Sequence, residues 1–180
     1  AMLALAVARE CGVALADALA GMAALDVRQM PSMRSAVKPL GDALLINDAY
    51  NANPGSARAA LALLSGVGSS RQRVAVLGTM RELGAQAGRA HREIAQAALD
   101  SGAHVVAGIG EFADALRAVA PDDPRVVTAL DVEDLWPRLR SRLAGDAAIL
   151  LEAARGVRLE RLLPYLTAWA AEDSSPYRTN

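Results

Sequence analysis

The 180-residue sequence is poor in several residue types that carry common chemistry. Its one cysteine, Cys11, excludes a disulfide within the chain and a zinc cluster made of cysteines. Lys38 is the only lysine and does not follow a glycine, so the chain has no Gly-x-x-x-x-Gly-Lys-Ser/Thr loop for binding phosphates. The two histidines, His91 and His104, are not at a metal-binding spacing. We therefore expect neither an independent phosphoryl-transfer site nor a metal site in this chain.

The balance of charge and the lack of long apolar runs exclude other classes of protein. The 19 basic and 20 acidic residues leave a formal net charge of −1, which favours neither nucleic acid nor anionic lipid as a partner. No uncharged run of about 18 apolar residues is present. The alanine-rich residues 2–25 contain Arg9, Glu10 and Asp17 and lack the features of a signal peptide. We expect a cytoplasmic monomer without nucleic-acid partners or membrane insertion.

What the chain has in abundance is small and aliphatic side chains. Hydrophobic residues make up 53% of the sequence, whereas aromatic residues make up only 3%. A core of Ala, Leu and Val suits helices that pack closely against a parallel sheet. The length is sufficient for one such domain and a fragment of another.

From Met33 onward, strand-like and helix-like segments alternate. The predicted strands are Met33–Val37, Ala43–Asn47, Arg73–Leu77, Val105–Ile109, Val126–Thr128 and Ala147–Leu151. The predicted helices are Gly55–Ser65, Ala87–Ser101, Phe112–Val119, Val132–Leu143 and Val157–Ala170. This alternation predicts an α/β fold with a Rossmann-like, open, mostly parallel six-stranded sheet flanked by helices.

The N-terminal region has a different pattern. Residues 2–10 and 15–24 are predicted to form two short helices, and residues 26–32 a linker. The polar C-terminal end has no helical pattern. We therefore expect a helical segment with its linker at 1–30, an α/β domain at 31–172 and a frayed tail at 173–180.

The segment Asn47–Pro54 holds the densest group of ligand-type side chains. It follows an apolar strand and precedes a helix, so it lies at the carboxyl end of a strand, where open α/β sheets bind ligands. Asp48, Asn51 and Asn53 supply short polar groups, and Tyr50 can stack or form a hydrogen bond. The alternative is structural, with Asn53 capping the helix and the other polar residues forming a turn. For Asn53 the capping interpretation is the stronger one.

A glycine pair, Gly108 and Gly110, also lies between a predicted strand and a predicted helix. The third glycine of a dinucleotide-binding Gly-x-Gly-x-x-Gly motif is missing, because Ala113 takes its place. We interpret this pair as an ordinary turn.

Several strings together resemble the Mur ligase family, and within it the C-terminal domain of the MurF-type ligases. These strings are Asp-x-Tyr-Asn-Ala-Asn-Pro at 48–54, Val74–Met80, Arg81–Gly84 and His91–Glu93. The resemblance extends from about Ala1 to about Arg161. It implies a C-terminal portion of a cytoplasmic, ATP-dependent ligase that joins D-alanyl-D-alanine to UDP-N-acetylmuramoyl-tripeptide in peptidoglycan synthesis, through an acyl phosphate. Residues 1–30 would then be the last helices of the central domain and a linker.

The resemblance also implies roles for individual residues. In the family, an arginine after the domain hinge and an aspartate at the end of the next strand face ATP. Arg34 would then offset charge on the transferred phosphate, and Asp48 would accept hydrogen bonds from the ribose. The implied residues are Arg34, Asp48, Asn51 and Asn53 for ATP, with Arg34 catalytic, and Tyr50, Asn53, Arg155 and Gly156 for the substrate.

The cofactors implied for the intact enzyme are ATP and Mg²⁺. In the family, the phosphate-binding loop and the magnesium ligands belong to the central domain. We therefore expect neither to bind tightly to this chain alone, and we predict no metal ligand within it.

The chain departs from the family pattern at three places. Met33-Arg34-Ser35-Ala36 stands where the family usually has Gly-Arg-x-Glu, and Thr79 replaces an aspartate. Residues 152–156 read Glu-Ala-Ala-Arg-Gly instead of a Lys-Gly-Ser-Arg-Gly-like string. We expect Glu152 to lie near Arg155 and to compete with an anionic substrate for its guanidinium.

Other interpretations stay open. Glu82 is predicted either to be functional or to cap the following helix, and His91 to be structural. The departures also allow a stand-alone, non-catalytic binding or interaction module derived from this domain. A third alternative is another amide ligase of the Mur or folylpolyglutamate type, which would share the fold.

Overall fold

The computed structural model describes residues 12–14, 16–17, 36–67 and 70–173. The chain divides into two compact units, Ala1–Ser32 and Met33–Asn180. The predicted N-terminal helices lie almost entirely outside the described residues, as do the linker at 26–32 and Arg34.

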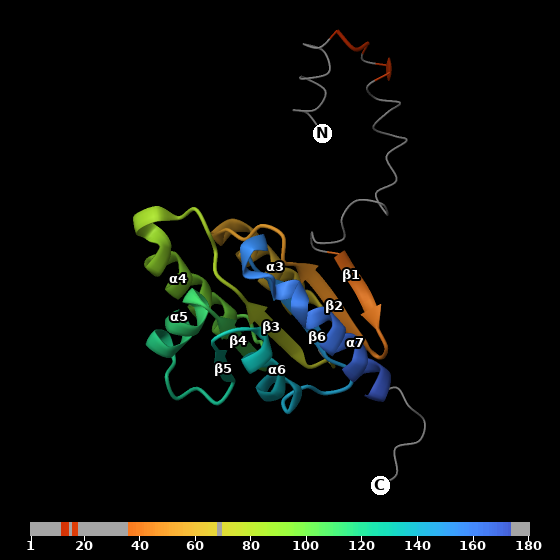
Figure 1. Cartoon of the computed structure of the whole chain (residues 1–180), viewed down its shortest axis with the longest axis vertical. Helices are drawn as coiled ribbons and strands as arrows, with labels where there is room; N and C mark the ends of the chain where they lie inside the picture. The colour runs from red at the N-terminus through yellow and green to blue at the C-terminus, as the bar shows by residue number, and fades with distance from the viewer. Residues whose placement is uncertain (1–11, 15, 18–35, 68–69, 174–180) are drawn as a thin grey trace. The chain divides into compact units, whose positions relative to one another are not determined.

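Six strands form a single sheet in the order β1-β2-β6-β3-β4-β5 (Figure 1). β1 pairs with β2 in antiparallel orientation, and every other neighbouring pair is parallel. The strands are β1 Ala36–Leu40, β2 Ala43–Asp48, β3 Arg73–Leu77, β4 Val105–Ile109, β5 Val126–Ala129 and β6 Ala148–Glu152. The predicted open, mostly parallel, six-stranded sheet is confirmed.

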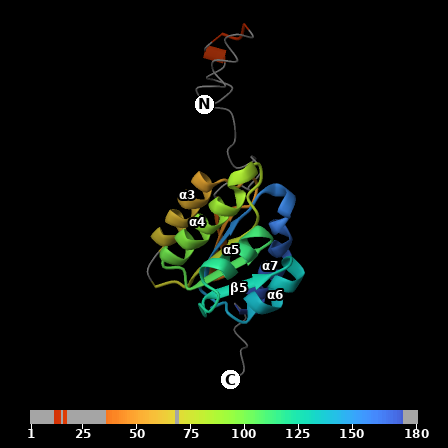
Figure 2. The same ribbon diagram turned by 90° about the vertical axis from the view of Figure 1, so that its left-hand side faces the viewer.

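Five α-helices of the second unit cover both faces of this sheet. They are α3 Pro54–Gly66, α4 Ala87–Asp100, α5 Glu111–Val119, α6 Val132–Arg140 and α7 Leu162–Asp173. Short 3₁₀ turns are η2 Gly84–Gln86, η3 Arg155–Val157 and η4 Leu159–Arg161. Helices α3, α4 and α5 pack on one face, and α6 and α7 on the other (Figure 2). The sheet is therefore doubly wound, and the prediction that helices flank it is confirmed.

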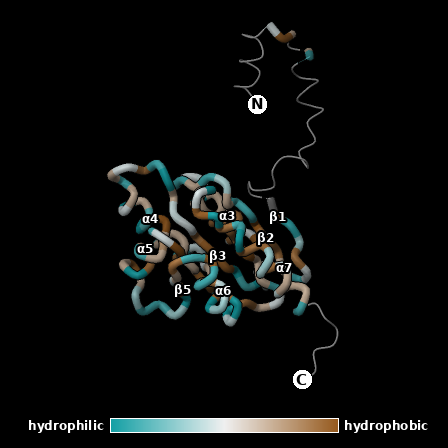
Figure 3. The backbone as a smooth tube through the Cα atoms, in the orientation of Figure 1, coloured by the Kyte–Doolittle hydropathy of each residue, from teal (hydrophilic) through white to brown (hydrophobic). Residues whose placement is uncertain are grey.

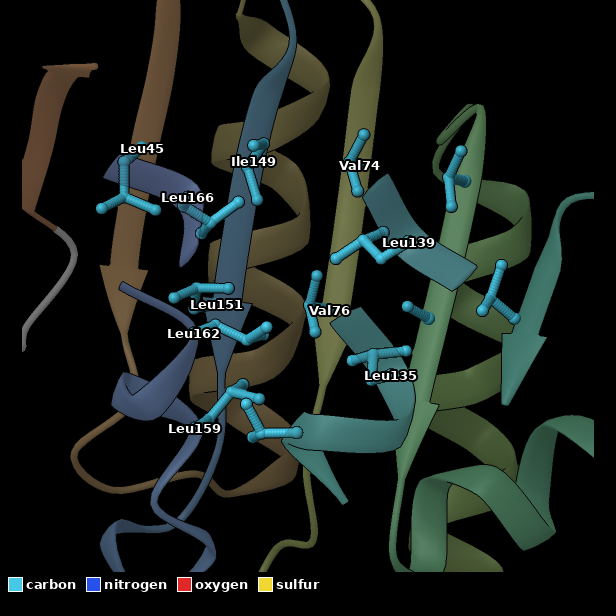
Figure 4. Close-up of a cluster of buried hydrophobic side chains, with 14 of the residues drawn as sticks. Leu45, Val74, Val76, Leu135, Leu139, Ile149, Leu151, Leu159, Leu162 and Leu166 are labelled. Atoms are coloured by element: carbon cyan, nitrogen blue, oxygen red, sulfur yellow. The ribbon is translucent and has the colours of Figure 1, made fainter. Parts of the chain in front are cut away.

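Each face of the sheet has its own apolar core, because successive strand residues point to opposite faces. Leu135 and Leu139 of α6 and Leu162 of α7 pack against alternate residues of the central strands, including Val76 and Leu151 (Figure 4). The opposite core contains Leu61, Ile94 and Phe112 from the other three helices. In Figure 3 the hydrophobic segments follow the central strands. The near-absence of polar residues in these strands is the pattern of a sheet covered on both sides.

Most predicted boundaries agree with the structure within two residues; the end of the first strand, the end of the fourth helix and both ends of the last helix differ more. The first strand continues to Leu40, past the predicted end at Val37, because it is an edge strand that tolerates Pro39 and ends in a tight turn at Gly41. The helix predicted to reach Leu143 ends at Arg140, where the chain changes to i→i+3 hydrogen bonds.

The last predicted helix, Val157–Ala170, was wrong at its start. Arg158 has a left-handed backbone with φ 58°, which breaks the segment into η3 and η4 before α7 begins at Leu162. Because helical periodicity continues across this break in the sequence, the pattern alone did not reveal it. The loop that follows β6 therefore has room for two short turns at the carboxyl edge of the sheet.

Candidate functional site at the carboxyl edge of the sheet

The loops that follow β2, β6 and β3 are joined by backbone hydrogen bonds at the carboxyl edge of the sheet. The Gly78 N–H donates to the carbonyl of Glu152 at 2.9 Å, and the Ala154 N–H donates to the carbonyl of Thr79 at 3.2 Å. On the other side, the Arg155 N–H donates to the carbonyl of Tyr50 at 3.1 Å. The loop after β6 is thus held between its two neighbours. This places residues 48–53 beside residues 152–156, far apart in the sequence.

Asp48 and Glu152 are register partners on the parallel strands β2 and β6. Their side chains point to the face covered by α3, since Ile46 and Leu150, two residues earlier on each strand, belong to the core of that face. Asp48 is 9% exposed and Glu152 is fully buried. The Ser56 hydroxyl, in the first turn of α3, lies 2.9 Å from Glu152 Oε1 and donates to it. Two acidic side chains therefore meet in a nearly dry environment.

Burial and the negative charge of Asp48 raise the pKa of Glu152 from 4.5 to about 8. The hydrogen bond from Ser56 acts in the opposite direction, because it favours the carboxylate, whereas the hydrogen bond with Asp48 favours the protonated acid. At neutral pH Glu152 is therefore mostly a neutral carboxylic acid that can donate a hydrogen bond.

The expected competition of Glu152 for Arg155 is wrong. The partners of Glu152 are Ser56 and Asp48, and none of the ion pairs between described residues includes Glu152. The physical reason is the strand alternation: Glu152 is the last residue of β6 and faces α3, whereas Arg155 has already left the strand and is exposed.

Arg155 instead contacts Tyr50. Its guanidinium carbon lies 5.5 Å from the centre of the Tyr50 ring, within the range of a cation–π interaction. Tyr50 is half-buried and Arg155 is exposed, so a cation on an aromatic platform faces solvent at this edge. Gly156 comes next, and a Cβ there would lie 2.7 Å from the guanidinium carbon of Arg81. A side chain at position 156 would displace Arg81 from the backbone.

Asn53 is a helix cap, as its residue type predicted. Its side-chain oxygen accepts from the N–H groups of Gly55 at 2.9 Å and Ser56 at 3.0 Å. The Ser56 hydroxyl in return accepts from the Asn53 N–H at 3.0 Å, which completes a capping box. Asn53 and Asn51 are both exposed beside Tyr50. The structure thus brings together the predicted site residues that it describes, which are Asp48, Tyr50, Asn51, Asn53, Arg155 and Gly156; Arg34 lies outside the described residues.

A cavity of about 790 Å³ opens at the same edge, beyond the ends of β3, β4 and β5. None of those six residues lines it. Its charged lining consists of Arg81 and Arg161 on one hand and Glu82, Glu111 and Asp131 on the other. The sequence interpretation missed Glu111, Asp131 and Arg161. The signal for Glu111 and Asp131 was their position, two residues after the end of a strand, at the carboxyl edge of the sheet.

Thr79 and His91 have clear structural partners near this cavity. Thr79 Oγ1 accepts from the Glu111 N–H at 3.0 Å, where the hydroxyl ties the loop after β3 to the start of α5. His91 is 1% exposed; its Nε2 accepts from the Met80 N–H at 2.9 Å, and its Nδ1 lies 2.7 Å from the carbonyl of Ala87. The proton of the neutral ring is therefore on Nδ1. The structural interpretation of His91 agrees with these contacts.

Glu82 does not cap the helix that begins at Ala87. The cap residue of α4 is Gln86, without a side-chain hydrogen bond, and Glu82 is exposed with φ 65°. A left-handed backbone is uncommon for glutamate and is often found where a loop borders a ligand site. Of the two alternatives for Glu82, capping is therefore excluded.

Among the described residues, no group of three or more His, Cys, Asp or Glu side chains could hold a metal ion. In the same part of the chain, no helix is long and apolar enough to cross a membrane.

The chain resembles known proteins over most of its length. The family model described as "Mur ligase, glutamate ligase domain" matches residues 33–156. A UDP-N-acetylmuramoyl-tripeptide–D-alanyl-D-alanine ligase of Treponema pallidum is 40% identical over 122 residues, which cover 66% of this chain and 26% of that protein. The ligase of the same name from Mycobacterium tuberculosis strain CDC 1551 is 38% identical, covering 93% of this chain and 37% of the relative. The chain thus spans between a quarter and two fifths of these relatives.

Solved structures show the same similarity. MurF from Acinetobacter baumannii superposes with a TM-score of 0.71 at 25% identity, over 89% of this chain and 35% of that one. MurF ligase from Thermotoga maritima, solved in complex with ADP, gives a TM-score of 0.67 at 24% identity, over 93% of this chain and 37% of that one. With the family model matching more than half of its residues, the chain belongs to the Mur ligase family.

Proposed function

We propose that this chain is the C-terminal portion of an ATP-dependent ligase that joins D-alanyl-D-alanine to UDP-N-acetylmuramoyl-tripeptide. The observation that carries the proposal is the meeting of two sequence-distant segments, 48–53 and 152–156, at one edge of the sheet. The names of the curated relatives support the choice of substrates. The domain boundaries that we propose are those expected from the sequence: 1–30, 31–172 and 173–180.

In this proposal, the longer enzyme uses ATP to convert the tripeptide carboxylate to an acyl phosphate. The amine of D-alanyl-D-alanine then attacks that carbonyl carbon, the bond to phosphate breaks, and an amide forms. The tasks of this segment are to bind, to orient and to exclude water, because an acyl phosphate hydrolyses when water reaches it. Closing the segment over the reacting groups would serve the last task.

The exposed cation Arg155 is proposed to receive the carboxylate of the dipeptide. A guanidinium can form two parallel hydrogen bonds to a carboxylate. The Tyr50 ring beneath it restricts the guanidinium, so less side-chain freedom is lost on binding. Asn53 and Gly156 would border this substrate.

Asp48 is proposed to accept hydrogen bonds from the ribose hydroxyls of ATP, with Asn51 and Asn53 nearby. Arg34 is proposed as the catalytic residue that offsets charge on the transferred phosphate. The segment is assigned no ligand to Mg²⁺, which ATP-dependent phosphoryl transfer uses to neutralise phosphate charge. We propose a cytoplasmic monomer that does not bind ATP or Mg²⁺ tightly when the segment is isolated.

The proposal is tested by measuring inorganic phosphate released by the longer polypeptide that contains this segment. Release should require ATP, the UDP-linked tripeptide and D-alanyl-D-alanine together. The 180-residue chain alone is the control and should release none, because it has no lysine-containing phosphate loop. Turnover by the isolated chain, or no dependence on D-alanyl-D-alanine in the longer protein, would contradict the proposal. A gene that encodes only this chain would favour the stand-alone binding module instead.

A further inference from the structure

One of the two carboxyl oxygens of Glu152 lacks a hydrogen-bond donor within the described part of the chain, and a proton on the carboxyl group would give it a hydrogen bond to make. Its Oε1 accepts from the Ser56 hydroxyl, whereas its Oε2 is buried and no N–H or O–H group of the described residues donates to it. The titratable side chain that faces it across the ladder is Asp48, and an ionised carboxylate can only accept. If both acids were ionised, Oε2 would stay unsatisfied beside a second negative charge, at a cost that buried sites avoid.

Within residues 36–67 and 70–173, the recorded neighbours of Glu152 on the adjoining strands and helix include no cation. From β2 it faces Asp48, and from α3 it faces the uncharged Ser56. From β3 its register partner is the apolar Leu77. Arg58, further along α3, is exposed and pairs with Glu93. The contacts therefore favour a state in which Asp48 and Glu152 together hold one proton and one negative charge.

We propose that Glu152 is a positioning residue that shares one proton with Asp48 and thereby holds the Asp48 carboxylate at the ligand edge of the sheet. The protonated acid donates through its second oxygen to Asp48, and the Ser56 hydroxyl fixes the first. The side chains of Asp48, Glu152 and Ser56 thus connect β2, β6 and α3 at the point where the loop to Tyr50 begins. Asp48 then carries the single charge of the pair, in a fixed orientation.

The shared proton depends on the contacts of Glu152 alone, whereas its effect on ATP binding rests on the proposed function of Asp48. Loss of the proton at high pH would place two negative charges side by side and would free Asp48 to move away from Glu152.

The shared proton is tested by titrating the 180-residue chain with ¹³C-labelled glutamate side chains by NMR. One carboxyl signal should titrate near pH 8 and should be absent from E152Q. In D48N its midpoint should fall by on the order of one pH unit, because the neighbouring charge is gone. In S56A it should rise, because a hydrogen bond to the carboxylate is lost. These opposite directions distinguish a specific pair from general burial.

A matched control is E93Q, which removes an exposed glutamate on α4 and should leave the titration near pH 8 unchanged. The inference is overturned if every glutamate signal of the wild type titrates below pH 6. It is also overturned if D48N leaves the midpoint where it was.

The effect on ATP binding is tested in the longer ligase by the pH dependence of the KM for ATP between pH 7 and 9.5. In the wild type this KM should rise several-fold as the shared proton is lost, whereas E152Q, which cannot ionise but can still donate, should lack this rise. Identical pH profiles of the two proteins would overturn the positioning role. If the longer protein showed no ligase activity in any form, the proposed function would fail, while the NMR titration would still decide whether the proton is shared.

Discussion

The backbone N–H of Arg155 donates to the carbonyl of Tyr50 at 3.1 Å, while the guanidinium of Arg155 lies 5.5 Å from the centre of the Tyr50 ring. Main chain and side chain of one residue thus contact the same tyrosine. The two contacts fix where the loop after β6 presents its cation. An anionic ligand that reached this edge would meet the guanidinium already oriented.

Replacing Arg155 by lysine should raise the KM for D-alanyl-D-alanine in the longer ligase. Lysine keeps the charge but cannot form the paired hydrogen bonds of a guanidinium, and we expect about 1.5–3 kcal/mol to be lost, or roughly 10- to 100-fold in KM. The KM for ATP should change much less. The control is R117K on the remote helix α5, where the arginine pairs with Asp114. Equal effects of R155K on both substrates would indicate a general effect on domain closure.

Replacing Asp48 by alanine should raise the KM for ATP by about 1–3 kcal/mol, the scale of deleting a hydrogen bond to a charged group. The matched control is D42A, because Asp42 is exposed at the opposite end of β2. Steady-state kinetics of the longer ligase, with circular dichroism of both variants, would measure this. An ATP KM that is unchanged in D48A would leave Asp48 as a structural partner of Glu152 only.

The E152Q variant should become more stable relative to the wild type as the pH rises. The pKa of Glu152 is about 8 in the folded chain and 4.5 in the unfolded chain, so its favourable contribution is complete below pH 4.5. Between pH 4.5 and 8 the unfolded state loses its proton first, so the wild type loses stability, by on the order of 5 kcal/mol in total. E152Q has no such titration.

The measurement is the midpoint of thermal unfolding of both proteins at several pH values. The difference between them should grow from pH 5 to pH 8 and then level off. A difference that stays constant with pH would show that the two side chains differ only in packing.

Two substitutions of Asn53 separate its capping role from its proposed ligand role. N53A should destabilise the chain by about 1 kcal/mol through loss of the cap, whereas N53S should keep most of the stability, because serine is also a good cap. Urea unfolding of the 180-residue chain measures both. If N53S nonetheless raises a KM of the longer ligase as much as N53A does, the amide of Asn53 contacts a ligand. If the kinetics of N53S are those of the wild type, Asn53 acts only as a helix cap.

Gly108 should not tolerate a side chain, although it lies in an ordinary strand. A Cβ there would lie 2.7 Å from Leu116 Cδ1 and 3.0 Å from the backbone of Phe112 on α5. G108A should therefore cost about 1–3 kcal/mol, the usual scale of overpacking. The control is G66A, where no atom lies within 4 Å of the added Cβ, and stability should rise by about 0.4–1 kcal/mol. Thermal unfolding of both variants gives the comparison, and a neutral G108A would mean that α5 shifts without strain.

The sequence by itself determined where most strands and helices lie, and that residues such as Asp48 stand at the carboxyl end of a strand. These features depend on local patterns: β3 and β4 coincide with short continuous apolar runs, and Asn53 followed by proline indicates a cap. The left-handed backbone of Arg158 could not be predicted in this way, because a change of φ at one residue does not alter the periodicity of the apolar residues.

Only the tertiary structure decided what each site residue touches. β6 is the last strand in sequence but inserts between β2 and β3, and this order places Glu152 beside Asp48 and Ser56, the latter 96 residues away. Strand order depends on how helices fill both faces of the sheet, a property of the whole chain rather than of any segment. The burial that keeps Glu152 protonated exists only once those helices are packed, so a position that suggested an exposed anion beside Arg155 became a buried acid beside Asp48.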